Sequence, residues 1–153
     1  MPSSQHRLPN YVLLTARDGA PCHDDPVIDH FGIICADYDR SKEYYDAVLA
    51  TLGFSRQMDV GAAVGYGRDG KPDFWVEDGA GRQATVGIHF AFQAANADEV
   101  RSFHDAAVAL GFESLHEPRI WPEYHPGYFG AFVRDPDGNN VEAVFHSAAP
   151  TDG

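Results

Sequence analysis

The sequence is poor in cysteine and in basic residues, and it has no long hydrophobic run. Two cysteines, Cys22 and Cys35, occur among its 153 residues, too few for a small domain held together by a framework of disulfides. The 11 Lys and Arg residues stand against 23 acidic residues, so the net charge is −12. This charge argues against nucleic acid and anionic membrane surfaces as partners.

No apolar segment approaches the length of a membrane span, and the N-terminus lacks the continuous hydrophobic core of a signal peptide. We therefore expect a cytoplasmic protein that does not act at a membrane. The chain has the length of one ordinary domain, and 44% of its residues are apolar, which is enough for a hydrophobic core.

Residues 1–25 differ from the rest of the chain because prolines and glycines interrupt them and they contain a single short apolar patch. We predict an N-terminal extension over residues 1–25, a single domain over residues 26–148 and a short tail over residues 149–153. Within the domain, hydrophobic periodicity and turns rich in glycine or proline separate helices from strands.

Two helices are predicted from their caps and from apolar spacing. The first runs from about 40 to 52 with Asp39 as its N-cap. The second begins at a capping box formed by Asn96 and Glu99 and ends near Leu110. The side chains expected to be buried are Tyr45, Val48, Leu49 and Leu52 in the first helix and Val100, Phe103, Ala107 and Leu110 in the second.

The order of the predicted elements repeats along the chain, with one strand before each helix and three strands after it. Leu52-Gly53-Phe54 matches Leu110-Gly111-Phe112, and His30-Phe31 matches His89-Phe90. The sequence therefore predicts an α+β fold of two βαβββ modules, about 26–83 and about 84–148. The predicted strands cover residues 27–35, 54–58, 62–67 and 74–77 in the first module and 86–93, 112–116, 128–134 and 140–146 in the second.

Three polar residues share the strand face that lies away from the predicted helices. Because alternate side chains of a strand lie on opposite faces, His30, His89 and Glu142 oppose the apolar side chains that pack on the helices. Glu142 lies inside the apolar run 141–145, where an acid is costly to bury unless it is paired or binds a metal. Two histidines and one carboxylate form a divalent-metal set that leaves positions open for a substrate. Each histidine taken alone could instead be a hydrogen-bonded core residue.

Four strings of residues resemble one known family: IDHFG at 28–32, DRSKEYY at 39–45, GIHFAF at 87–92 and DPDGNNVE at 135–142. They look like the vicinal oxygen chelate superfamily, which includes glyoxalase I, extradiol dioxygenases, fosfomycin-resistance thiol transferases and bleomycin-resistance proteins. The resemblance covers about residues 26–148 and implies paired modules whose sheets curl around a metal-binding cleft. It also implies a metal chelated by two adjacent oxygens of a small-molecule substrate, and a homodimer.

A resemblance to glyoxalase I in particular implies a metal ligand on the first and last strand of each module, four in all. Alignment of the Asp-Gly turns of the two modules places Phe74 opposite Glu142, and phenylalanine cannot bind a metal. Asp73 and Glu77 are odd in register relative to Phe74, so Asp73 is expected to point away from the site. The resemblance therefore favours three ligands, as in the dioxygenase and thiol-transferase branches.

The loop WPEYHPGY at residues 121–128 is dense in tyrosine and histidine. His125 and Tyr128 could act as acid, base or oxyanion donor over the metal. The alternative is that this loop forms a packed lid or a dimer contact.

Aromatic residues provide candidates for a substrate pocket. We expect Phe74, Trp75 and Trp121 to line it, and core packing is the alternative for Phe74 or Trp75. His104, on the second helix, is expected to face solvent. His146 either borders the site or ends its strand.

The sequence leaves three kinds of function open. In the first, one divalent ion (Fe²⁺, Mn²⁺, Zn²⁺ or Ni²⁺) serves a lyase or a ring-cleaving dioxygenase. In the second, a metal-free protein sequesters an aromatic or antibiotic ligand, and retention of all three metal ligands counts against it. In the third, a thiol transferase acts on fosfomycin. Because that substrate is an anion, its binding site should contain a cluster of basic residues. Arg119 and Arg134 are the candidates near the predicted site.

Overall fold

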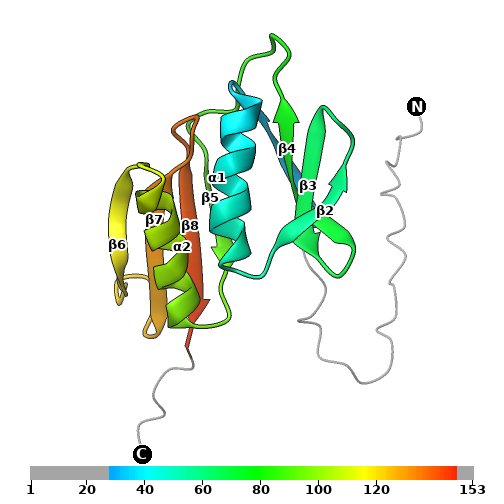
Figure 1. Ribbon diagram of the computed structural model, residues 1–153. Coiled ribbons are helices and arrows are strands. Elements are labelled where there is room, and N and C mark those ends of the chain that lie inside the picture. The colour runs from blue at the N-terminus through cyan, green and yellow to red at the C-terminus, as the bar shows by residue number, and fades with distance from the viewer. Residues whose placement is uncertain (1–27, 148–153) are drawn as a thin grey trace, which may run out of the picture.

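The computed structural model describes residues 28–147, so the predicted extension 1–25 and tail 149–153 lie outside the described residues. The α+β fold of two βαβββ modules is confirmed (Figure 1). Module one contains β1 (Phe31–Cys35), α1 (Tyr38–Ala50), β2 (Ser55–Asp59), β3 (Ala63–Arg68) and β4 (Lys71–Asp78). Module two contains β5 (His89–Gln93), α2 (Ala97–Ala109), β6 (Ser114–Ile120), β7 (Tyr128–Arg134) and β8 (Asn140–His146).

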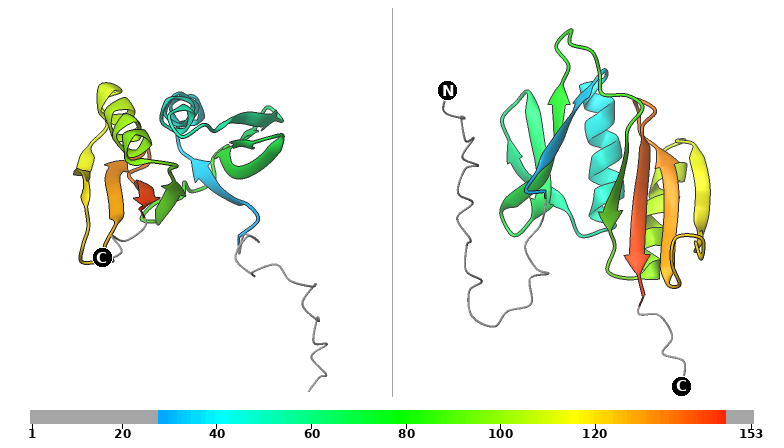
Figure 2. Two further views of the ribbon diagram at one scale, coloured as in Figure 1. Left: turned by 90° about the horizontal axis from the view of Figure 1, so that it is seen from below. Right: turned by 180° about the vertical axis from the view of Figure 1, so that it is seen from behind.

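Each module forms its own four-stranded mixed sheet. The strand orders are β1-β4-β3-β2 and β5-β8-β7-β6, and in each sheet the first pair is parallel while the other pairs are antiparallel. Figures 1 and 2 show both helices on one side of the molecule and the strands on the other. One face of each sheet therefore has no helix over it, and the two sheets do not close around a common cleft within the described part of the chain.

The hydrophobic core lies between the helices and the sheets, and aromatic rings join the two modules. Phe31 of β1 contacts Phe90 of β5 with ring centroids 5.0 Å apart. Phe74 of β4 contacts Phe92 of β5 at 5.3 Å and Tyr45 of α1 at 4.9 Å. A fully buried ring such as that of Phe74 contributes about 1.5–3 kcal/mol relative to an exposed one. The two modules are therefore fixed to each other through the strands that begin them.

The turn before β8 adds a polar connection between the modules. Asp135 is buried, and its carboxylate accepts hydrogen bonds from the hydroxyl of Tyr45 on α1 (2.7 Å) and from the amide of Asn139 (2.8 Å). Asp137 accepts a hydrogen bond from the amide of Ala36 after β1 (3.1 Å). Burial raises the pKa of Asp137. The DPDGNN string thus holds the last hairpin against module one.

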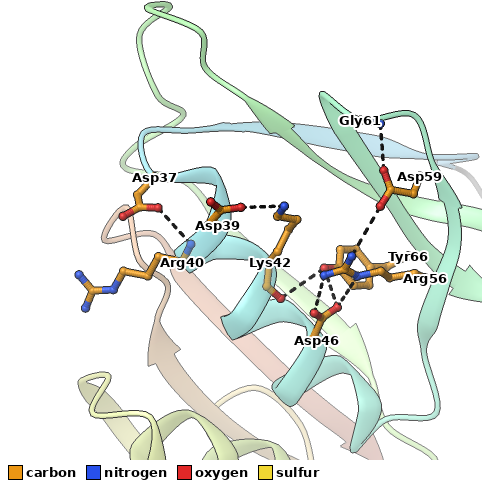
Figure 3. A network of polar contacts seen from close by, with 9 residues as sticks. All are labelled: Asp37, Asp39, Arg40, Lys42, Asp46, Arg56, Asp59, Gly61 and Tyr66. Carbon is orange, nitrogen blue, oxygen red and sulfur yellow. Dashed lines mark hydrogen bonds and ion pairs between the residues drawn. The ribbon is translucent and has the colours of Figure 1, made fainter.

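The N-cap of α1 is Asp37, so the prediction of Asp39 was wrong. The Asp37 carboxylate accepts a hydrogen bond from the amide of Arg40 at 3.0 Å (Figure 3). Asp39 lies in the first helical turn, where its negative charge suits the helix dipole and pairs with Lys42 at 2.8 Å. The predicted capping residue of α2 is confirmed, because Asn96 accepts a hydrogen bond from the amide of Glu99 at 2.9 Å.

Two expectations about α2 were wrong. His104 was expected to face solvent, but it is buried, and its Nε2 lies 2.7 Å from the hydroxyl of Ser114 on β6. The edge strand β6 packs over this side of the helix, which helical periodicity alone does not reveal. Leu110 was expected to be buried, but it is the C-cap and more than a third of it is exposed, because the helix ends beyond the core there.

Candidate functional site

Glu142 lies at the centre of the uncovered face of the second sheet. It pairs with Ala91 of β5 on one side and with Phe132 of β7 on the other. Its carboxylate accepts a hydrogen bond from the hydroxyl of Tyr128, and its other oxygen lies 3.0 Å from Nε2 of His89. The structure therefore brings three predicted site residues together on one face: His89, Tyr128 and Glu142.

Strand alternation explains why this acid faces away from the helices. Val141 and Ala143, its neighbours along β8, are fully buried on the helix side. Opposite the carboxylate, Gly130 of β7 has no side chain, and a Cβ there would lie 3.0 Å from Oε1 of Glu142. The glycine leaves the space that the carboxylate group occupies.

The charge environment of Glu142 is unusual for a carboxyl group that is 1% exposed. Within residues 28–147, neither lysine nor arginine forms an ion pair with it, and its polar partners are a phenol and an imidazole. Burial, and then the hydrogen bond to Glu142, raise the pKa of Tyr128 above its ordinary value. Tyr128 therefore keeps its proton and acts as a donor. A buried acid with so little compensation is expensive for a purely structural residue.

Asn140 adds an oxygen with no partner to the same region. It shares the uncovered face of β8 with Glu142 by strand alternation, and it pairs directly with His89 of β5. Its Oδ1 is buried and has no hydrogen-bond partner among the described residues. An unsatisfied buried oxygen beside His89 and Glu142 is consistent with a cation or a ligand group that completes the site.

Two histidines extend this face beyond Tyr128. Nε2 of His125, in the loop before β7, lies 2.9 Å from Nδ1 of His146, the last residue of β8. The ring of His125 contacts that of Tyr128 at 5.4 Å between centroids. Trp121, from the start of the same loop, is 6% exposed and lies under Tyr124, with rings stacked 5.7 Å apart. The guanidinium of Arg119 lies 3.3 Å from the centre of the Trp121 ring, so neighbouring side chains largely cover Trp121.

The uncovered face of the first sheet carries a hollow of about 440 Å³. Nδ1 of His30, one of the lining residues, lies 2.8 Å from the carboxylate of Asp29, and its Nε2 forms no hydrogen bond within residues 28–147. Lys71 lies 3.4 Å from that carboxylate. The hydrogen bond with His30, followed by Lys71, lowers the pKa of Asp29. The residues that line the hollow are His30, Phe31, Gly32, Trp75 and Glu77.

The observed register corrects the predicted alignment of the two modules by one residue. Phe74 pairs with Phe31 and is buried in the core, whereas Trp75 pairs with Gly32 just as Glu142 pairs with Ala91. The cause is the hairpin before β4, which carries a register shift and places its strand one residue later after the Asp-Gly turn. The counterpart of Glu142 is therefore Trp75, which cannot bind a metal either.

The corrected register also bears on the sheet face of Asp73 and Glu77. Glu77 shares the parity of Trp75 and lines the same hollow, so it lies on the uncovered face of β4. Asp73 lies at the register shift between β3 and β4, where strand alternation does not hold, so the expectation that it points away stays a prediction. Asp73 pairs with Lys71 at 2.7 Å, and Glu77 pairs with Arg82 at 3.3 Å. Both carboxylates have partners within their own module.

The structure does not bring His30 into one group with His89 and Glu142. Across residues 28–147 of a single chain, no three side chains of His, Cys, Asp or Glu lie close enough to hold a metal ion. The site is instead divided between the two uncovered sheet faces. Asn140 was not predicted as a site residue, and for His146 the sequence left open whether it borders the site or ends its strand. Both share strand parity with Glu142, which was the available signal.

Comparisons with known proteins agree with this architecture. A family profile described as the glyoxalase/bleomycin resistance protein/dioxygenase superfamily matches residues 27–143. A glyoxalase/bleomycin resistance protein from Albidiferax ferrireducens T118 is 28% identical with a TM-score of 0.67, and the match covers 78% of this chain and 98% of that one. Among curated proteins no match was found.

Two more distant solved structures share the fold. A lactoylglutathione lyase from Agrobacterium tumefaciens is 22% identical with a TM-score of 0.57, covering 80% of this chain and 95% of that one. A glyoxalase/bleomycin resistance protein/dioxygenase family enzyme from Burkholderia phytofirmans PsJN is 19% identical with a TM-score of 0.60, covering 78% and 98%. In addition, neither helix of the described chain is long and apolar enough to cross a membrane.

Proposed function

Because this chain belongs to the glyoxalase/bleomycin resistance protein/dioxygenase superfamily, we propose that it is a divalent-metal-dependent enzyme acting on a small substrate chelated through two adjacent oxygens. The observation that carries this proposal is the buried carboxylate of Glu142, which is 3.0 Å from His89 and has no cationic side chain beside it in the described chain. A metal ion is the partner that such an acid lacks.

The residues present fit a divalent ion. Two ligands about 2.1 Å from one ion and at right angles to each other lie about 3.0 Å apart, which is the separation of His89 Nε2 and Glu142 Oε2. Histidine ligands of metals commonly donate their other ring nitrogen to a carboxylate, as His30 does to Asp29. The ion could be Fe²⁺, Mn²⁺, Zn²⁺ or Ni²⁺, all of which accept imidazole and carboxylate ligands.

A homodimer would complete the site. His30 lies on the uncovered face of module one, and His89 and Glu142 lie on that of module two. In the proposed dimer, module one of one protomer faces module two of its partner. Two such sites would then form, related by two-fold symmetry. Small members of this superfamily commonly pair or exchange modules, which supports this arrangement.

The bound ion would supply Lewis-acid stabilisation of negative charge on the substrate oxygens. Around it, Tyr128 donates a hydrogen bond to Glu142 and fixes the orientation of the carboxylate. Of the two predicted acid–base residues, Tyr128 is proposed as a hydrogen-bond donor because it keeps its proton, and His125 lies beside it in the loop before β7. Trp75 supplies the proposed aromatic wall of the substrate pocket, and Trp121 lies behind the exposed ring of Tyr124. Phe74 cannot line the pocket, because it is buried in the core.

Trp75 at the position corresponding to Glu142 favours three protein ligands over four. Three ligands leave room for a chelating substrate and, with iron, for O₂, so lyase and ring-cleaving dioxygenase chemistry both fit. A thiol transferase acting on an anionic substrate is less well supported, because Arg119 pairs with Glu123 and Arg134 donates to the carbonyl of Gly138. The cytoplasmic location and the absence of nucleic-acid partners stay predictions from the sequence.

The second candidate is a metal-free binding protein. Aromatic residues gathered around Trp121 favour it. So does the placement of His30 on one sheet face and of His89 and Glu142 on the other. Elemental analysis distinguishes the two. Protein purified without a histidine tag is incubated with each of the four ions and then freed of excess metal. The enzyme proposal predicts one ion per chain in the wild type and loss of uptake in His89→Ala and Glu142→Ala. Uptake that is absent, or equal in all three proteins, would refute it.

A further inference from the structure

Two imidazoles meet where the loop before β7 packs against the end of β8. Nε2 of His125 lies 2.9 Å from Nδ1 of His146, and the two rings are stacked with an interplanar angle of 18°. The remaining ring nitrogen of His125, Nδ1, lies 2.8 Å from the carbonyl oxygen of Pro126. Both nitrogens of His125 are therefore engaged, whereas one nitrogen of His146 has no partner among these contacts.

The hydrogen-bond partners determine which nitrogen carries each proton. A carbonyl oxygen only accepts, so Nδ1 of His125 must be the protonated nitrogen of that ring. In the neutral ring Nε2 is then an acceptor, and it can accept only from a protonated Nδ1 of His146. The neutral ring of His146 consequently has its lone pair on Nε2. The tautomer of His146 is thus set by His125, and the tautomer of His125 by the backbone.

This lone pair lies on the face that carries the proposed metal ligands. His146 shares the parity of Glu142 on β8 and pairs with Tyr128 of β7. The rings of His146 and Tyr128 are 5.1 Å apart, and Tyr128 in turn reaches the carboxylate of Glu142. His146, Tyr128, Glu142 and His89 form a continuous row along one sheet. His146 is exposed, so a bound molecule can reach it.

We propose that His146 is a catalytic base of this site and that His125 is its positioning residue, which deepens the proposed function and rests on it. The substrate class that fits is one with a hydroxyl group on the part that extends over Tyr128. The O–H bond breaks, its electron pair stays on the oxygen, and the proton passes to Nε2 of His146. The resulting imidazolium still donates through Nδ1 to His125. A neutral lone pair at this place disfavours substrates that present a carboxylate there.

The assignment changes the role expected for His125. With both nitrogens engaged, His125 cannot take a proton from a substrate without losing a hydrogen bond to Pro126 or to His146. The groups that face His146 are the imidazole of His125 from the loop and the phenol of Tyr128 from β7, and within residues 28–147 His146 forms no ion pair with an acid or a base. It therefore depends on His125 for its orientation.

The first test measures the tautomers by long-range ¹H–¹⁵N correlation NMR of metal-free protein at a pH where both rings are neutral. We expect Nδ1–H for both histidines in the wild type. His125→Gln keeps an acceptor near the position of Nε2 and should preserve the Nδ1–H form of His146, whereas His125→Leu should convert it to mainly Nε2–H, the form favoured by a solvated imidazole. An Nε2–H form of His146 in the wild type would overturn the proposal.

The second test measures binding of 4-nitrocatechol, a chromophore with two adjacent hydroxyl groups, to metal-loaded protein. His146→Leu and His125→Leu should each weaken binding roughly tenfold, and His125→Gln should restore it, because one hydrogen bond is lost and regained. Metal content is measured in the same samples and should not change. Loss of metal in His146→Leu would overturn the proposal, because His146 would then be a ligand. Unchanged binding in that variant would overturn it as well. Since the tautomer test needs no metal, its failure is distinct from failure of the proposed function.

Discussion

Replacement of Glu142 by glutamine should stabilise the metal-free protein while it abolishes metal binding. The carboxyl group is 1% exposed, is hydrogen-bonded by Tyr128 and by an imidazole, and has no lysine or arginine beside it within residues 28–147. Glutamine keeps the shape and an oxygen that accepts from Tyr128, but it removes the acid that is costly to bury. A residue retained for function at the expense of stability behaves in this way.

The expected gain follows from the desolvation of one polar group. Removal of a poorly compensated buried acid should increase the free energy of unfolding by about 1–2 kcal/mol. For a chain of this size, that gain corresponds to an increase in Tm of about 2–8 °C. Differential scanning calorimetry of both proteins in the presence of a chelator measures the change. Elemental analysis of the same proteins after loading measures the metal.

A matched control separates this effect from a change in net charge. Glu43→Gln removes the same charge from an exposed position on α1. It should change Tm by less than about 2 °C, which corresponds to the roughly ±0.5 kcal/mol typical of surface positions. If Glu142→Gln lowers Tm instead, the carboxylate stabilises the fold itself, and the reasoning that it is retained for a metal is refuted.

Three further changes test other parts of the structure. Asp29→Asn removes the carboxylate that holds Nδ1 of His30. Metal affinity, measured by competition with a chelator, should therefore fall about 10–100-fold. An unchanged affinity would show that His30 is not a ligand held in this way. Asp135→Ala leaves buried donors without an acceptor, among them the hydroxyl of Tyr45, and urea denaturation should show a loss of about 3–5 kcal/mol; a loss below about 1 kcal/mol would contradict the structural role of this turn. Burial raises the pKa of Tyr44 and Tyr45 well above 10. Because the folded-state pKa values lie above the unfolded values, the contribution of these groups to stability is complete below about pH 10 and is lost as the pH rises further. Between about pH 10 and 11 the two groups together should cost about 2 kcal/mol of unfolding free energy. Stability that is flat over this range would contradict this expectation.

Local patterns in the sequence were sufficient to predict the helices and strands of this fold and the part of the site that lies on the second sheet. The bounds of β7 and β8 agree with the prediction, Tyr128–Arg134 and Asn140–His146. A Pro and Gly turn separates them, and apolar alternation continues through both. The same alternation placed Glu142 and His89 on one face, which the structure bears out through their contact.

Register and tertiary placement could not be obtained in this way. The alignment that paired Phe74 with Glu142 assumed equal hairpins, but the hairpin between β3 and β4 contains a register shift that depends on backbone geometry. Two aspartates near the start of α1 have the same capping chemistry, so the sequence did not distinguish Asp37 from Asp39. Strand parity likewise says which residues share a face, but it does not say whether two sheets face each other. This is why His30 was grouped with His89.

The central claim is that one metal site is built from His30 of one protomer and from His89 and Glu142 of its partner. Co-expression of His30→Ala with His89→Ala tests it most directly, because a mixed dimer would contain one intact site and one site with both changes. Each variant alone should bind no metal. The co-expressed pair should bind about a quarter of the wild-type amount by elemental analysis, since about half of randomly paired dimers are mixed and each has one of two sites. Full metal content in His30→Ala alone, or none in the co-expressed pair, would contradict the shared site.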